Sequence, residues 1–96
     1  MTISADRRLV VTVGGVLDAT AVPDLERIVR AGLSPTIDLL VLDLRTVEHL
    51  DDEAVAALVR IQARCRVWPV GLRVLGSEAV HAAVAQDATL AFLPVE

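Results

Sequence analysis

The chain has 96 residues, which suits one folded domain, and we expect a single domain over residues 1–96. Hydrophobic residues make up 54% of it, above the roughly 45–50% of an average globular protein, so a well-packed interior is expected and disorder is not. All nine basic residues are arginine, and thirteen acids leave a net charge of −4, which is the wrong sign for holding nucleic-acid phosphates and argues against a nucleic-acid partner.

The first strand is predicted over residues 9–13, because β-branched and aliphatic residues precede the pair Gly14 and Gly15, which we expect to end it. A short strand around Ile3, joined to it by a polar turn at residues 6–8, is compatible with the sequence. The two segments together predict an N-terminal hairpin.

A helix is predicted from Val22, since apolar residues recur three and four apart as far as Leu33 and Gly32 is suited to its end. The next segment, residues 37–44, is an aliphatic run with acids only at its margins. This pattern is typical of a strand covered on both faces, so we expect it in the middle of the sheet.

A second helix is predicted to begin at the acids of residues 51–53, where free backbone N–H groups favour negative charge, and to stop before Pro69. A strand at residues 72–75 should follow. Ser77 is suited to cap a third helix through Ala88. Residues 90–93, ending at Pro94, predict a short edge strand.

Strands therefore alternate with helices after the initial hairpin, a pattern that gives a largely parallel sheet with right-handed crossovers. The predicted fold class is α/β, with a mostly parallel sheet of four to five strands and about three helices.

Four segments, taken in order, resemble the STAS domain of the anti-sigma factor antagonists, and they span almost the whole chain. They are VTVGGVLD (11–18), LLVLDLRTVEHLDDEAV (39–55), GLRVLG (71–76) and SEAVHAAVAQDATLAFLPVE (77–96). The resemblance implies a STAS-like fold, in which a strand ending at residues 43–44 is followed by a short loop and then by the family's switch segment.

The switch segment of the family reads Asp, Ser, Ser or Thr, Gly, Leu, and the first Ser is phosphorylated by a partner that is both kinase and anti-sigma factor. The resemblance places residues 51–55 there, so that Asp52 occupies the phosphorylation-equivalent position and Glu53 follows it. Phosphate adds roughly −1.5 to −2 charge, so these two acids permanently hold about the charge of the modified form. The chain also stops where many members add one more helix.

Two interpretations of the acidic residues remain open. Asp51, Asp52 and Glu53 form a partner-binding surface, which the resemblance favours, or they only cap a helix. Asp18 matches an acid of the family near that surface, or it bonds its own loop backbone.

No catalytic, metal or cofactor site is predicted. His49 and His81 lack a ligand spacing, and Gly14 and Gly15 match no nucleotide-binding loop. Cys65 lies on the apolar stripe of the second helix, which is typical of a buried thiol. The chain is therefore expected not to be an enzyme.

The resemblance implies a protein partner, an anti-sigma factor or serine kinase, and a function in sigma-factor regulation by partner switching. The alternatives are an accessory STAS subunit that docks on the ATPase of a lipid-trafficking ABC transporter, and a purely structural or dimerising module. Cys65 is alone, and the longest aliphatic run near the middle, residues 39–42, is far short of the ~20 residues that cross a bilayer. We therefore expect a cytoplasmic location without membrane insertion.

The arginines are scattered along the chain. Their main group, Arg60, Arg64 and Arg66, is typical of a solvated helix edge.

Overall fold

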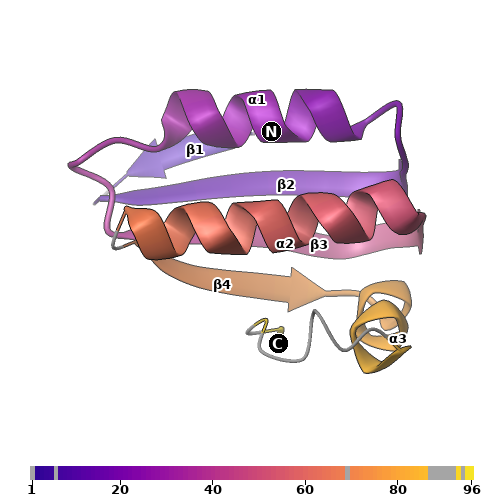
Figure 1. Cartoon of the computed structure of the whole chain (residues 1–96). Helices are drawn as coiled ribbons and strands as arrows, with labels where there is room; N and C mark the ends of the chain where they lie inside the picture. The colour runs from indigo at the N-terminus through magenta and orange to yellow at the C-terminus, as the bar shows by residue number, and fades with distance from the viewer. Residues whose placement is uncertain (1, 6, 69, 87–92, 94) are drawn as a thin grey trace.

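The computed structural model describes residues 2–5, 7–68, 70–86, 93 and 95–96. Four strands form one sheet in the order β1-β2-β3-β4, in which β1 is antiparallel to β2 and the other neighbours are parallel (Figure 1). The strands are β1 (Thr2–Ala5), β2 (Arg8–Leu17), β3 (Leu39–Leu50) and β4 (Gly71–Gly76). The helices are α1 (Val22–Gly32), α2 (Asp52–Val67) and α3 (Glu78–Gln86). The predicted α/β class with a mostly parallel sheet is confirmed, and the strands and helices of the described residues are compatible with the predicted numbers.

The core lies between the sheet and the two longer helices, α1 and α2, which lie on the same face of the sheet (Figure 1). Each strand turns alternate residues toward these helices. On β3 these residues are Leu40, Leu42 and Leu44, each 0% exposed. Leu42 is paired in register with Val11 of β2 and Val74 of β4, so β3 has the interior position that its aliphatic run predicted.

The opposite face of β3 is also covered over part of its length. Val41 on that face is buried, at 8% exposed. Asp43 follows it there and binds Arg45 through two short contacts of 2.9 Å, and this hydrogen-bonded guanidinium lowers the pKa of the Asp43 carboxyl. Helices α1 and α2 lie on the other face (Figure 1), and the burial of Val41 agrees with the interior position that the aliphatic run predicted.

The starts and ends of the helices follow local chemistry. Helix α1 has Pro23 in its first turn and ends at Gly32, and α2 ends at Val67, just before Pro69, as predicted. At α3 the N–H of Val80 donates to the Ser77 hydroxyl at 3.3 Å, which confirms the predicted cap.

The prediction that Gly14 and Gly15 end the first strand was wrong, and so was the loop expected after residue 44. Strand β2 continues to Leu17 and β3 to Leu50, and the two remain paired through register shifts on either side of the glycines. A Cβ on Gly14 would lie 2.5 Å from the hydroxyl oxygen of Thr46, and Gly15 has a φ of +75°. The glycines thus permit a close approach and a bulge within the strand pair.

An edge contact with β4 is present just beyond the residues of the predicted C-terminal strand. Val95 forms a parallel bridge with Val74, the N–H of Glu96 donates to the Val74 carbonyl at 2.7 Å, and the N–H of Gly76 donates to the Glu96 carbonyl at 2.9 Å. The edge contact with β4 therefore lies at residues 95–96. Residues 90–92 and the predicted last turn of the third helix lie outside the described residues.

The thiol of Cys65 is buried on α2, at 4% exposed, and desolvation raises its pKa against the opposing effect of Arg64. Because only the thiolate is nucleophilic, we expect native protein at about pH 7.5 to react with iodoacetamide at least about tenfold more slowly than the urea-unfolded chain. Mass spectrometry of timed samples measures both rates. Equal rates would mean that Cys65 is accessible and that its assignment to the core is wrong.

Candidate functional site

The carboxylate of Asp51 joins two segments at the carboxyl end of the parallel strands. Its Oδ1 accepts from the N–H of Ala54 at 2.9 Å and so caps α2, while its Oδ2 accepts from the N–H of Ala19 at 3.1 Å. The N–H of Asp51 donates in turn to the Leu17 carbonyl at 3.2 Å. The start of α2 is thereby fixed to the loop that follows β2, and Asp51 has a structural role.

Asp18 lies in the same loop and bonds its own backbone. Its Oδ1 accepts from the N–H groups of Thr20 at 3.0 Å and Ala21 at 3.2 Å. Its carbonyl accepts from the N–H groups of Ala21 and Val22, both at 3.0 Å, at the start of α1. This is the local interpretation that the sequence left open for Asp18, and it stabilises the turn that leads into the helix.

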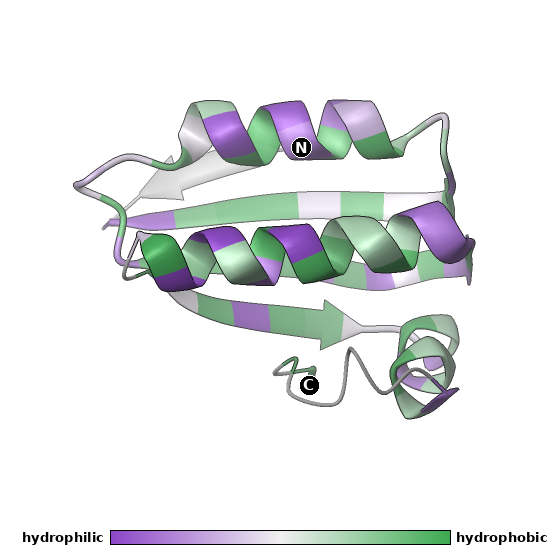
Figure 2. Ribbon diagram, in the orientation of Figure 1, coloured by the Kyte–Doolittle hydropathy of each residue, from purple (hydrophilic) through white to green (hydrophobic). Residues whose placement is uncertain are grey.

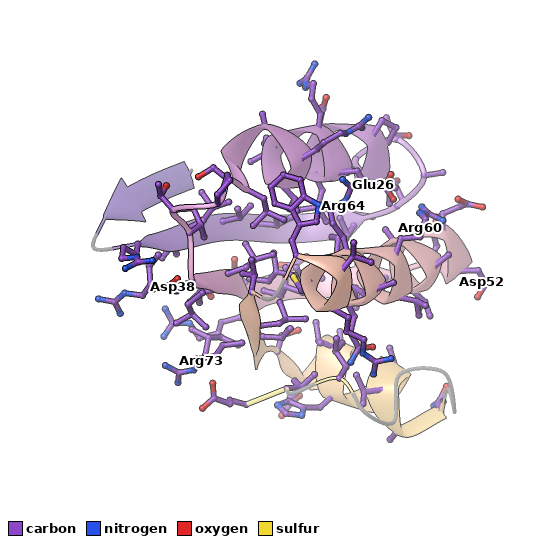
Figure 3. The ribbon with its side chains drawn as sticks, turned by 60° about the vertical axis from the view of Figure 1, so that its left-hand side comes forward. Glu26, Asp38, Asp52, Arg60, Arg64 and Arg73 are labelled. Atoms are coloured by element: carbon purple, nitrogen blue, oxygen red, sulfur yellow. The ribbon has the colours of Figure 1, made fainter. Side chains whose placement is uncertain are left out.

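Asp52 and Glu53 lie in the first turn of α2 and are exposed, as Asp51 is, but they differ from Asp18 and Asp51 in their contacts. Their carboxylates have no hydrogen bond or ion pair with any residue that the structure describes. Figure 3 shows Asp52 directed away from the molecule at the end of its helix. The four predicted acids are therefore brought to one end of the sheet, where two bond the backbone and two face the solvent.

The exposed carboxylates of Asp52 and Glu53 give this end of the sheet negative charge. Glu48 and His49 are also exposed near the end of β3, and Val16, at 53% exposed, lies beside them at the end of β2. Among the described residues, no group of three His, Cys, Asp or Glu side chains could hold a metal ion. No helix in the described ranges is long and apolar enough to cross a membrane.

A second surface, which the sequence analysis had interpreted as a solvated helix edge, lies toward the other end of α2. Arg60 and Arg64 line a groove against α1, where the Nε of Arg60 donates to Glu26 at 2.7 Å. Figure 3 shows Glu26, Arg60 and Arg64 on one side of the molecule. The four-residue spacing of the arginines was visible in the sequence, but their proximity to α1 depends on the packing of the two helices.

Comparison with known proteins identifies the family. A family model described as "Mlab, STAS domain" matches residues 1–92. No curated protein matches the chain.

A solved structure described as "Crystal Structure Analysis of Mglu" is similar in fold, with a TM-score of 0.74 and 19% sequence identity over 81% of this chain. The matched region covers 19% of that longer chain, so this likeness concerns the fold alone. The match to the family model covers nearly all the elements described above, including the α2 start with its acidic residues. The chain belongs to the STAS domain family, whose members are protein-interaction modules.

Proposed function

We propose that this chain is a non-catalytic protein-binding module of the antagonist type, which regulates a sigma factor through partner switching. Its partner, an anti-sigma factor or serine kinase, contacts the acidic end formed by Asp18, Asp51, Asp52 and Glu53. Within this set Asp52 and Glu53 make the direct contacts, whereas Asp18 and Asp51 hold the loop and the helix start in place.

One observation carries the proposal. The carboxylates of Asp52 and Glu53, where the resemblance places the family's switch segment, are exposed and have no partner in the described part of the chain. A helix start stabilised by Asp51 alone does not need them, since its cap is already made at 2.9 Å. Two exposed acids on a fixed helix end supply about the charge of a phosphoserine, roughly −1.5 to −2, without a kinase.

The fixed charge also determines which partner the surface selects. A partner that binds only unmodified antagonists binds this surface weakly. The charges of Asp52 and Glu53 repel acidic groups of that partner, and they must lose their hydration when the contact forms. A partner that presents Arg or Lys is favoured, because paired charge offsets this desolvation. The module therefore acts as a permanently modified antagonist, which is released by the first class of partner and held by the second.

An accessory STAS subunit that docks on the ATPase of a lipid-trafficking ABC transporter is the second candidate. We retain it because the matching family model is described by the name Mlab and not by that of an antagonist. The same acidic end would then contact the ATPase. The two candidates differ in the partner and not in the surface that binds it.

A binding titration tests the proposal. Purified kinase-type anti-sigma factors and transporter ATPases from the source genome are titrated with wild type, Asp52→Ser, Glu53→Ser and the double variant. For a partner that the charge repels, we expect the double variant to bind at least about tenfold more tightly, which is about 1.4 kcal/mol. For a basic partner we expect a loss of similar size and a weaker dependence on salt.

Glu78→Ser is the matched control, because Glu78 is also an exposed acid in the first turn of a helix. It should leave every affinity unchanged. Identical affinities for wild type and the double variant would mean that Asp52 and Glu53 only stabilise their helix, and the proposed site would be wrong. Binding to the ATPase with none to the anti-sigma factors would establish the second candidate.

A further inference from the structure

The C-terminal end of α2 exposes an apolar patch, made of Val67 and Trp68. Val67 is 78% exposed and Trp68 is 40% exposed. The patch separates two open hollows, one of about 510 Å³ toward Ile37 and one of about 380 Å³ toward Arg64. In Figure 2 the C-terminal tip of α2 is green beside purple bands, so apolar and charged residues lie together at this end of the helix.

Arginines lie next to the patch, on its side toward α1. Arg30, Arg60 and Arg64 line the groove between α1 and α2, which has a volume of about 140 Å³. Arg60 is paired with Glu26, whereas Arg30 and Arg64 have no acidic partner among the residues described. Because Arg64 also lines the hollow beside Trp68, the groove and the patch form one continuous surface, called here the basic end.

A surface of opposite charge is present on the same molecule. Asp52 and Glu53, whose carboxylates have no partner among the residues described, lie at the other end of α2, a helix of 16 residues. At 1.5 Å per residue, Asp52 and Arg64 lie about 18 Å apart along the helix, so one copy cannot bring them into contact with each other. Val16, the other large hydrophobic residue that is strongly exposed in the described chain, lies at the acidic end of the sheet.

We propose that the basic end of one copy binds the acidic end of a second copy of this chain. The carboxylates of Asp52 and Glu53 then pair with the free guanidinium groups of Arg30 and Arg64, and the contact removes Val67 and Trp68 from water. Opposite charge fixes the orientation, and the apolar patch supplies the favourable desolvation. Two such contacts close an antiparallel pair, whereas repetition of a single contact gives an open chain of copies.

This inference does not depend on the proposed function, but it has a consequence for it. Self-association covers the acidic end that the protein partner is proposed to bind. Association of the module with itself and with its partner would therefore compete. The self-association experiment uses this chain alone, so its outcome is separate from that of the partner titration.

Self-association is measured on the full chain by analytical ultracentrifugation between about 1 µM and about 1 mM, a range that covers weak and moderate affinities. Trp68 is the single tryptophan, so its fluorescence reports directly on the patch. We expect the average mass to rise with concentration and the emission maximum to move to shorter wavelength over the same range. A monomer with unchanged emission at the highest concentration would overturn the proposal.

Charge reversal tests which surfaces meet. Arg30→Glu with Arg64→Glu, and separately Asp52→Arg with Glu53→Arg, should each weaken self-association at least about tenfold. An equimolar mixture of the two double variants should associate again, because each then presents the charge that the other lacks. If neither variant changes the association, or if the mixture stays monomeric, the assigned contact is wrong.

Two controls separate charge and patch from unfolding. Arg8→Glu changes an exposed arginine that has no ion pair in the described chain and lies on the face of the sheet opposite the helices, and it should leave the association unchanged. Trp68→Ala should weaken association without changing the circular dichroism spectrum. A blue shift of Trp68 on phosphatidylglycerol vesicles in a chain that stays monomeric would assign the basic end to a membrane surface instead and refute the proposal.

Discussion

Truncation of Leu42 to alanine should lower the free energy of unfolding by about 3–5 kcal/mol. Leu42 is 0% exposed and pairs with Val11 and Val74 on both neighbouring strands, so no adjacent element can move into the space that the side chain leaves. The total stability of a domain of this size is about 5–15 kcal/mol, so the variant loses a large part of it. Urea unfolding followed by circular dichroism measures the difference.

The matched control lies on the same strand. Leu39 is only partly buried and belongs to the opposite face, so Leu39→Ala should cost about 1–2 kcal/mol, in proportion to the smaller area removed from water. Equal losses for the two variants would contradict the assignment of Leu42 to the helix-covered face.

Replacement of Asp51 by alanine should lower the free energy of unfolding by about 1.5–3 kcal/mol. A capping residue contributes about 0.5–2 kcal/mol, and the second bond, from the N–H of Ala19, adds about 1 kcal/mol because its acceptor is charged. Both the α2 start and the loop after β2 lose their connection. Urea unfolding gives the total, and hydrogen exchange at the amides of Ala19 and Ala54 localises it.

Two variants define the cause of this loss. Asp51→Asn keeps an acceptor oxygen and should cost less than about 1 kcal/mol. Asp52→Ala removes only an exposed charge near the helix dipole and should cost about 0.3–1 kcal/mol. If Asp52→Ala proves as damaging as Asp51→Ala, the division between a capping acid and a contact acid would be refuted.

The limits of α1 and α2 and the N-terminal cap of α3 could be predicted from the sequence. Helix α1 begins and ends where Val22 and Gly32 predicted, α2 begins at the acids and ends before Pro69, and Ser77 caps α3. Each of these limits depends on the backbone groups and side chains of a few neighbouring residues, so the information is local. The aliphatic run of β3 likewise predicted an interior strand.

Strand length was decided by pairing and could not be read locally. Gly14 and Gly15 are ordinary signals for the end of a strand, yet β2 passes through them because β3 continues beside it to Leu50 and Thr46 fills the space of the missing Cβ. A glycine that breaks an isolated strand is the residue that a close approach between strands requires. The sequence contains both Gly14 and Thr46, but it does not show that they lie side by side.

By itself, the sequence determined the α/β class, the limits of the helices, the STAS resemblance and the presence of an acidic cluster. The tertiary structure decided how that cluster is divided, because only the approach of the loop after β2 gives Asp51 a second partner, whereas Asp52 has no partner in the described ranges. It also decided that Arg64 meets α1 and that Trp68 stays partly exposed. Periodicity and capping are properties of consecutive residues, whereas the partners of a side chain depend on segments that only packing brings together.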